Sequence, residues 1–406
     1  MRPPILRTAP LLLVGAALFA ACTERLPSDA SLLEPGAPRL TVATNPFVTM
    51  DAGLTHACGL TSAGQGWCWG RNATAQLGDS SAASTQVPVA VRHPTGVTFT
   101  KVTAGNSHSC AITSAGQAWC WGYNADSRLG DSTTTMGLMP VAVKPVGAVA
   151  FTSISAGGQH TCGLNSSGQA YCWGYNFYGQ LGDSTTTFAK TPVAVHQPAG
   201  VTFTSIHAAD KHTCALTSGG QAYCWGYGGD GAMGHNALLG EPIPTAVQQP
   251  AGVTFASITT EYNHTCGVTS GGQAYCWGLN TKSQLGDSTT TKRLVPVAVK
   301  QPAGVTYASI TTGYWHTCAR TSAGQEYCWG AGDRGQLGNG TFVNFSRIPV
   351  AVSQPAGVTF ASVHNGGYHS CALDGGGQAY CWGRNDYSQV GDNSTTDRST
   401  PTAVQH

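Results

Sequence analysis

One histidine and two cysteines recur together at fixed spacing along the chain. The pattern is His-x-Cys, nine residues and then Cys-Trp-Gly, as in His56, Cys58 and Cys68. Imidazole and thiolate groups bind zinc, so each copy could supply three ligands to a metal ion. The same two thiols could instead form a disulfide bond, or remain free and buried. The choice among these depends on the element that positions them and on the cellular compartment.

This pattern occurs seven times, with a step of 52 residues five times and 53 once. Each copy also has an aromatic residue before the histidine and Pro-[Val/Thr]-Ala-Val near its end. A short, fixed period indicates a repeat array, and seven complete copies predict a closed ring. The copies begin at His56, His108, His160, His212, His264, His316 and His369.

Each copy contains four short runs typical of β-strands. In the second copy we predict strands at 97–102, 108–113, 117–122 and 140–143, because these runs are rich in Val, Thr and aromatic residues and are separated by turn-forming residues. Four-stranded units repeated around an axis are the blades of a β-propeller. We therefore expect an all-β, seven-bladed β-propeller with one repeat of 52–53 residues per blade.

The cysteines are expected to pair within the blades. In a hairpin symmetric about Ala63, Cys58 and Cys68 lie opposite each other, within reach of a disulfide bond. We predict seven such bonds and no metal site, and we expect each histidine to hold a turn through a backbone hydrogen bond. The predicted pairs are Cys58 with Cys68, Cys110 with Cys120, Cys162 with Cys172, Cys214 with Cys224, Cys266 with Cys276, Cys318 with Cys328 and Cys371 with Cys381.

The N-terminus predicts export. Two arginines precede an apolar run, which is typical of a signal peptide over residues 1–21. The segment Phe19-Ala20-Ala21-Cys22 resembles a bacterial lipobox, so we expect lipidation at Cys22, the one unpaired cysteine. Residues 22–40 then form a flexible tether and 41–406 the propeller. This predicts a lipid-anchored protein of the bacterial cell envelope, at the outer membrane or cell surface, in an oxidising compartment that favours disulfides.

The recurrent segments Ala-Gly-x-x-His-[Thr/Ser]-Cys, Ser-x-Gly-Gln-x-Tyr-Cys-Trp-Gly and Gln-Leu-Gly-Asp resemble the repeats of the regulator of chromosome condensation family over residues 41–406. The resemblance implies a seven-bladed propeller. The best known member is a nuclear guanine-nucleotide exchange factor with a wedge-like insertion and a basic tail. Here the uniform repeats leave no room for an insertion, and 20 Lys and Arg balance 19 Asp and Glu, which disfavours nucleic acid as a partner. Exchange activity thus rests on family analogy alone. Light-sensing members use tryptophans before the repeat histidine, and here only Trp315 holds such a position.

Two segments differ in every copy, namely the residues before the histidine and those after Trp-Gly. If both reach one face of the ring, their aromatic residues could anchor a partner there. Neutral drift in surface loops is the alternative. The candidate binding face consists of Tyr262, Tyr314, Trp315, Tyr368, Phe177, Tyr178 and Tyr387.

No sequence motif of a known catalytic site is present, so we expect no enzyme and no cofactor. Acidic residues in the variable loops, such as Asp126, Asp210, Asp230 and Asp333, leave a glycosidase-type carboxylate pair open. The tryptophans of Cys-Trp-Gly are expected in the core, and the Asp after Gln-Leu-Gly is expected to cap a turn, with calcium binding as the alternative.

These observations together favour a non-catalytic exported scaffold. A disulfide-bonded propeller would present its variable loops to a protein partner at the cell envelope. The alternatives are a glycan-binding module and a cryptic hydrolase. We expect a monomer that contacts the membrane only through its lipid.

Overall fold

The structure, a computed structural model, describes residues 46–144, 147 and 149–405. The predicted signal peptide, the lipidation site Cys22 and the tether all lie outside the described residues. The described part of the chain contains no helix of the length and apolar character needed to cross a bilayer.

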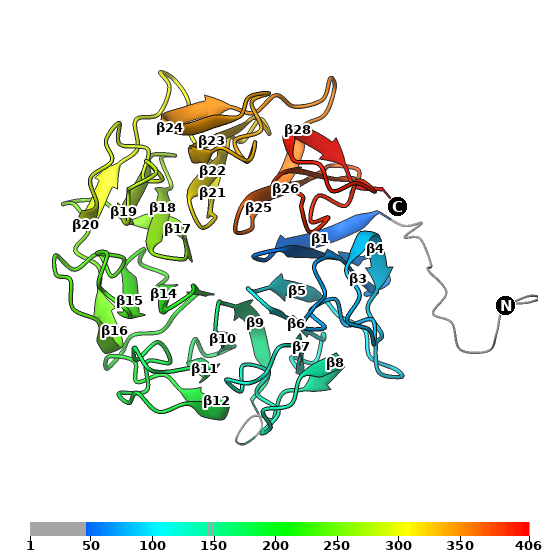
Figure 1. Cartoon of the computed structure of the whole chain (residues 1–406). Coiled ribbons are helices and arrows are strands. Elements are labelled where there is room, and N and C mark those ends of the chain that lie inside the picture. The colour runs from blue at the N-terminus through cyan, green and yellow to red at the C-terminus, as the bar shows by residue number, and fades with distance from the viewer. Residues whose placement is uncertain (1–45, 145–146, 148, 406) are drawn as a thin grey trace, which may run out of the picture. The chain divides into compact units, whose positions relative to one another are not determined.

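Seven antiparallel sheets, each of four consecutive strands, are arranged around an axis as the blades of a propeller (Figure 1). The predicted fold class is therefore confirmed. Blade one contains β1 (Phe47–Ala52), β2 (His56–Thr61), β3 (Gly66–Gly70) and β4 (Thr85–Ala90), hydrogen-bonded in that order. The first strand of each blade lies nearest the axis and the fourth forms the outer rim (Figure 1).

The other six blades repeat this order. Blades two to four contain β5 (Lys101–Ala104), β6 (His108–Ile112), β7 (Ala118–Gly122) and β8 (Gly137–Ala142); β9 (Phe151–Ala156), β10 (His160–Asn165), β11 (Ala170–Gly174) and β12 (Ala189–Ala194); and β13 (Ser205–Ala208), β14 (His212–Leu216), β15 (Ala222–Gly226) and β16 (Glu241–Ala246). Blades five to seven contain β17 (Phe255–Glu261), β18 (His264–Thr269), β19 (Ala274–Gly278) and β20 (Arg293–Ala298); β21 (Ser309–Thr312), β22 (His316–Arg320), β23 (Glu326–Gly332) and β24 (Val343–Ala351); and β25 (Phe360–Asn365), β26 (His369–Asp374), β27 (Ala379–Gly383) and β28 (Arg398–Ala403).

The strand boundaries differ from the predicted ones at the ends of blade two. The innermost strand begins at Lys101 rather than at residue 97, because the preceding residues connect the blades and Phe99 N donates to Gly64 O of blade one at 3.1 Å. The outermost strand begins earlier, at Gly137, which pairs with Gly122 beyond a break in register. A pattern of apolar residues does not distinguish a connecting segment from the strand it enters.

The second and third strands of each blade hold the disulfides. In blade one, Cys58 and Cys68 are register partners of β2 and β3, with Cα atoms 4.1 Å apart. Both are fully buried, because each sheet is covered by its neighbours on both faces. All seven predicted pairs are bonded in the structure: Cys58–Cys68, Cys110–Cys120, Cys162–Cys172, Cys214–Cys224, Cys266–Cys276, Cys318–Cys328 and Cys371–Cys381.

The tryptophan of every Cys-Trp-Gly segment is fully buried and joins two blades. Trp121 Nε1 of blade two donates to Gln76 O of blade one at 2.9 Å, and the same bond occurs at all seven junctions. A buried indole N–H needs an acceptor, and here the neighbouring blade supplies it. The expected core position of these tryptophans is therefore confirmed.

The repeat histidines also join blades, but through a different partner than predicted. His56 Nε2 lies 2.8 Å from Ser109 Oγ of blade two, and that hydroxyl donates back to Gln76 O at 2.9 Å. The partner is thus a side-chain hydroxyl of the next blade rather than the backbone of a turn. Burial lowers the pKa of His56 to about 4 and that of His160 to about 3, so these imidazoles are neutral near pH 7.

The ring is closed between blade seven and blade one, and this contact is here called the closing junction. No strand is exchanged there, since both blades are built of consecutive strands. Trp69 Nε1 donates to Gln389 O at 3.1 Å, and Asn393 N donates to Gln86 O at 3.1 Å. Phe47 and Trp69 also pack with residues of blade seven. Apolar contact and hydrogen bonds therefore close the ring.

A candidate binding face

The two variable segments of each blade lie on the same face of the ring. In blade six, Ala331 N, just after Trp-Gly, donates to the carbonyl oxygen of Trp315, just before the histidine, at 2.8 Å. The glycine between them is required: Gly330 has φ +95°, and a Cβ there would lie 2.5 Å from Trp315 O. Equivalent bonds in the other blades, such as Arg71 N to Thr55 O at 2.9 Å, bring all the variable segments to this face.

Four of the predicted aromatic residues form one cluster, here called the central cluster. Tyr262 stacks on Tyr314 with ring centroids 4.7 Å apart and lies 5.1 Å from Trp315. Trp315 Nε1 donates to the hydroxyl of Tyr368 at 3.1 Å. All four side chains are half-buried. The loops of blades five, six and seven thus hold one another in place and still expose aromatic surface.

Tyr387 joins this cluster through an arginine that the sequence did not single out. The Arg384 guanidinium lies 5.4 Å from the ring of Tyr368 and 5.4 Å from that of Tyr387. Arg71 of blade one covers Tyr387 at 4.8 Å. Cation–π contacts of this kind extend the aromatic surface toward the rim and across the closing junction.

Phe177 and Tyr178 belong to a second group, here called the rim cluster. Their ring centroids are 5.2 Å apart, and Tyr178 lies 5.2 Å from Tyr227 of blade four. Tyr175 contacts Phe188 at 4.8 Å. Phe177 is 63% exposed. Sequence reasoning missed Tyr175 and Tyr227, although both directly follow Trp-Gly, and it missed Phe188 because that residue comes from the outer part of blade three.

Polar side chains fill the axial mouth of this face. Asn106 Nδ2 donates to Asp210 Oδ1 at 3.1 Å, and Glu261 lies with them at the mouth, where a space of about 10 Å³ remains. Burial raises the pKa of Asp210, while Lys211 opposes that shift. Burial and the charges of Asp210 and Glu261 raise the pKa of Tyr314 well above its ordinary value. The mouth is therefore nearly closed and contains two carboxyl groups, Asp210 and Glu261, whose pKa values burial raises.

The other loop acids have local partners. Asp126 forms an ion pair with Arg128, and Asp230 accepts a hydrogen bond from Asn263 at 2.7 Å. Asp333 accepts one from Gln336 at 3.2 Å. These contacts hold Asp126 and Asp333 within their own loops and link Asp230 of blade four to blade five.

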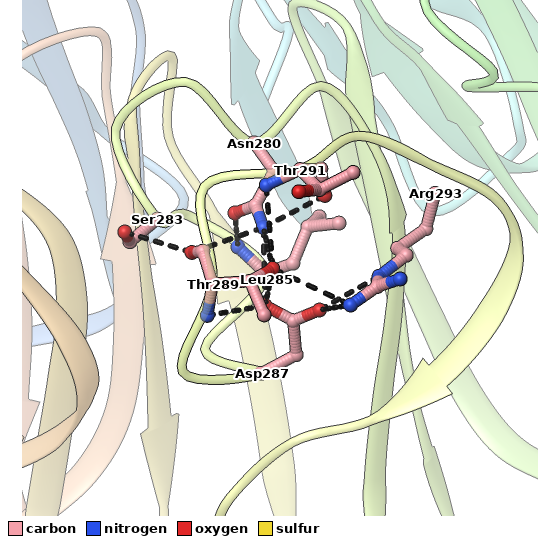
Figure 2. Close-up of polar contacts among 7 residues, drawn as sticks. All are labelled: Asn280, Ser283, Leu285, Asp287, Thr289, Thr291 and Arg293. Atoms are coloured by element: carbon pink, nitrogen blue, oxygen red, sulfur yellow. Dashed lines mark hydrogen bonds and ion pairs between the residues drawn. The ribbon is translucent and has the colours of Figure 1, made fainter.

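The Asp after Gln-Leu-Gly organises a turn, as Figure 2 shows for blade five. Asn280 Nδ2 donates to Asp287 Oδ1 at 3.1 Å and to Thr291 O at 3.0 Å, while Leu285 N donates to Asn280 Oδ1 at 3.0 Å. Arg293 Nε donates to the second oxygen of Asp287 at 2.7 Å. The side-chain amide of Asn280 occupies the centre of the loop, and the oxygens of Asp287 and Thr291 point toward it. The turn-capping interpretation therefore fits better than a calcium site.

Blades four and six support this interpretation because they change both partners together. The Asn is replaced by Gly228 and Gly332, and the Asp by His235 and Asn339. A residue pair that changes as a unit between copies is consistent with direct contact between its members.

One group of potential metal ligands lies close together among the described residues, namely Cys318, Glu326 and Cys328. The two sulfurs are bonded to each other, so they are not available as thiolates. Glu326 is fully buried, and burial raises its pKa to about 8 although Arg320 lies nearby. Five other blades have Ala and blade one has Gly at this position.

Comparison with known families gives one consistent result. The model of the RCC1-like domain matches residues 137–406, and two models of the regulator of chromosome condensation (RCC1) repeat match residues 63–112 and 99–128.

Comparisons with individual proteins agree with the family match. The chain is 27% identical over 370 residues to the ultraviolet-B receptor UVR8 of Arabidopsis thaliana, which covers 91% of this chain and 84% of the receptor. Human WBSCR16 has a similar structure, with a TM-score of 0.76, 20% identity and coverage of 84% of this chain and 94% of that one. Prp20p of Saccharomyces cerevisiae has a TM-score of 0.75, 21% identity and coverage of 90% and 88%. These two structures show a shared fold.

Proposed function

We propose, since the chain belongs to the family of the regulator of chromosome condensation (RCC1) repeat, that it is a non-catalytic scaffold that binds a protein partner through the central cluster. The observation that supports this most directly is the contact of Tyr262, Tyr314, Trp315 and Tyr368 across three blades. Blades one to three have Leu54, Asn106 and Gly158 at the position of Tyr314. The shared blade core therefore does not require an aromatic residue there.

The chemistry of this surface favours a protein as the partner. Aromatic residues and arginine are enriched at the centres of protein interfaces, and the cluster combines both. Its side chains are already held by stacking and by the bond from Trp315 to Tyr368, so little side-chain entropy is lost on binding. The yeast relative Prp20p binds Gsp1p and histones, which supports a role in protein binding for this fold.

The compartment is part of the proposal. Seven buried disulfides are typical of an oxidising environment and rare in the cytosol. We propose that residues 1–21 direct export, that Cys22 is lipidated and that residues 22–40 tether the propeller, residues 41–406, to the cell envelope.

Affinity capture from native envelopes tests the function. The full-length, epitope-tagged chain serves as bait beside a Tyr314→Ala/Trp315→Ala variant, which removes the centre of the cluster. A Leu138→Ala variant is the matched control, because Leu138 is 44% exposed on an outer strand. We expect a stoichiometric protein that the control retains and the double variant loses. A protein retained equally by all three baits would show that the central cluster is not the binding site.

A further inference from the structure

The axis of the propeller contains a cavity that the binding face does not use. Its volume is about 710 Å³, and the first strands of all seven blades line it. Asn106, Asp210 and Glu261 restrict one end, at the mouth already described. At the other end Lys101 is exposed. This volume is within the range of small-molecule binding sites, and the cavity is accessible from the face opposite the central cluster.

Serine and threonine residues alternate with aliphatic residues in the wall of this cavity. At one height along the axis, each of the seven blades contributes a residue at the equivalent position of its first strand. Most of these side chains form a hydrogen bond with the next blade. Ala156 N donates to Thr103 Oγ1 at 3.2 Å, and Ala208 N donates to Ser155 Oγ at 3.0 Å. Such hydroxyls keep a second lone pair or their own proton for another partner. The residues at this level are Asp51, Thr103, Ser155, His207, Thr259, Thr311 and His364.

Asp51 and His364 form a pair at the closing junction. Asp51 Oδ2 accepts from Ala104 N at 2.9 Å, a bond that the hydroxyls of Thr103, Ser155 and Thr311 accept in three other blades. The second oxygen, Oδ1, lies 3.6 Å from His364 Nδ1. This side of the cavity therefore offers a carboxylate and an imidazole as hydrogen-bonding groups.

His207 lies across the axis from that pair, because blade four is opposite the junction of blades seven and one in the ring order (Figure 1). It makes no hydrogen bond with any described residue. Burial lowers its pKa to about 4, so the ring is neutral and has one donor and one acceptor nitrogen. Ser153 Oγ and Ser205 Oγ are buried in the same wall without a partner among the described residues.

We propose that this axial cavity binds a small neutral carbohydrate of one or two sugar rings. Donors and acceptors surround the axis on all sides, as the hydroxyl groups of a sugar require. An apolar ligand would leave the buried hydroxyls of Ser153 and Ser205 without a hydrogen-bonding partner.

Ligand-observed and protein-observed NMR on the full chain test this directly. The probes are glucose, N-acetylglucosamine, cellobiose and diacetylchitobiose, and the imidazole resonances of His207 report on the site. We expect saturation transfer to at least one sugar together with a shift of the His207 signals. The variant His207→Thr should weaken the binding of that sugar about tenfold, as the loss of one or two hydrogen bonds predicts.

The variant is chosen so that the fold is retained. Threonine occupies the same position in blades two, five and six, as Thr103, Thr259 and Thr311. Leu138→Ala on the outer rim is the control and should bind like the unmodified chain. If none of the four sugars gives saturation transfer, or if His207→Thr binds the sugar with unchanged affinity, the cavity contains only water and the proposal is wrong. Either result leaves the capture experiment on the central cluster unaffected.

Discussion

His369 lacks the hydroxyl partner that the other six repeat histidines have, because Ala57 stands at the position of that hydroxyl in the next blade. The six other positions have Ser or Thr, as in Ser109 opposite His56. Both ring nitrogens of His369 are without a partner among the described residues. Within the described part of the chain, Gln389 O at the same junction accepts a hydrogen bond from Trp69 alone. Among the described residues, the closing junction therefore lacks the histidine–hydroxyl link that the other six junctions have.

Ala57→Ser should restore that link. A new hydroxyl could bond to His369 Nε2 and donate to Gln389 O, and a net gain of about 1 kcal/mol in the free energy of unfolding is expected. Urea denaturation of the two proteins measures it. Ser109→Ala is the matched control, since it creates the same defect at the first junction and should destabilise by about 1–3 kcal/mol. Equal stability of Ala57→Ser and the unmodified chain would contradict the proposed role of the hydroxyl.

Glu326 should make stability depend on pH. Its pKa is raised to about 8 in the folded state, above the value of an exposed glutamate. A group with a raised folded pKa contributes stability that is complete at pH below the unfolded pKa and declines as the pH rises through the folded pKa. The unmodified chain should therefore lose stability between about pH 5 and pH 8, on the order of a few kcal/mol.

The isosteric variant Glu326→Gln isolates this effect. It cannot ionise, so its free energy of unfolding should exceed that of the unmodified chain at pH 8 and approach it at pH 5. Glu326→Ala, which introduces the residue found in five other blades, should behave in the same direction. Parallel stability curves for the glutamate and glutamine proteins across this range would show that Glu326 is not protonated in the fold.

The turn centred on Asn280 should be stable without calcium. Removing its amide in Asn280→Ala leaves Asp287 Oδ1 and Thr291 O each without one donor, so a loss of about 1–3 kcal/mol is expected. Chelation with EDTA should leave the melting temperature of the unmodified chain unchanged. A melting temperature that falls on chelation and recovers with calcium would instead identify the loop as an ion site.

Loss of one disulfide should destabilise the ring without abolishing it. Cys110 and Cys120 are ten residues apart, so the chain-entropy model predicts a cost of about 2–3 kcal/mol for Cys110→Ala/Cys120→Ala. Calorimetry provides the comparison. In the unmodified chain the buried sulfurs should resist a thiol reductant until urea is added, as alkylation and mass spectrometry would show. Rapid reduction under native conditions would mean that the blades open locally far more often than their burial suggests.

The repeat made the fold predictable, whereas contacts between blades were harder to foresee. A spacing of ten residues around a turn places Cys58 opposite Cys68 whatever the rest of the chain does. The partner of His56 is 53 residues further along, so it depends on how consecutive blades stack. The aromatic residues predicted for the candidate binding face also fall into two separate clusters. Phe177 and Tyr178 lie in the rim cluster and Tyr262 in the central cluster, because the segment after Trp-Gly leads to the outermost strand of a blade whereas the segment before the histidine joins its two innermost strands.

The location of the disulfides has a consequence for how the protein is made. Each bond joins cysteines of one hairpin, so every bonded cysteine pairs with its nearest neighbour along the chain on the far side of a turn. Oxidation of one blade therefore requires no other blade to be present. A chain exported as proposed above can acquire these bonds one hairpin at a time, and the contact between the first and the last blade forms only after the last blade has been synthesised.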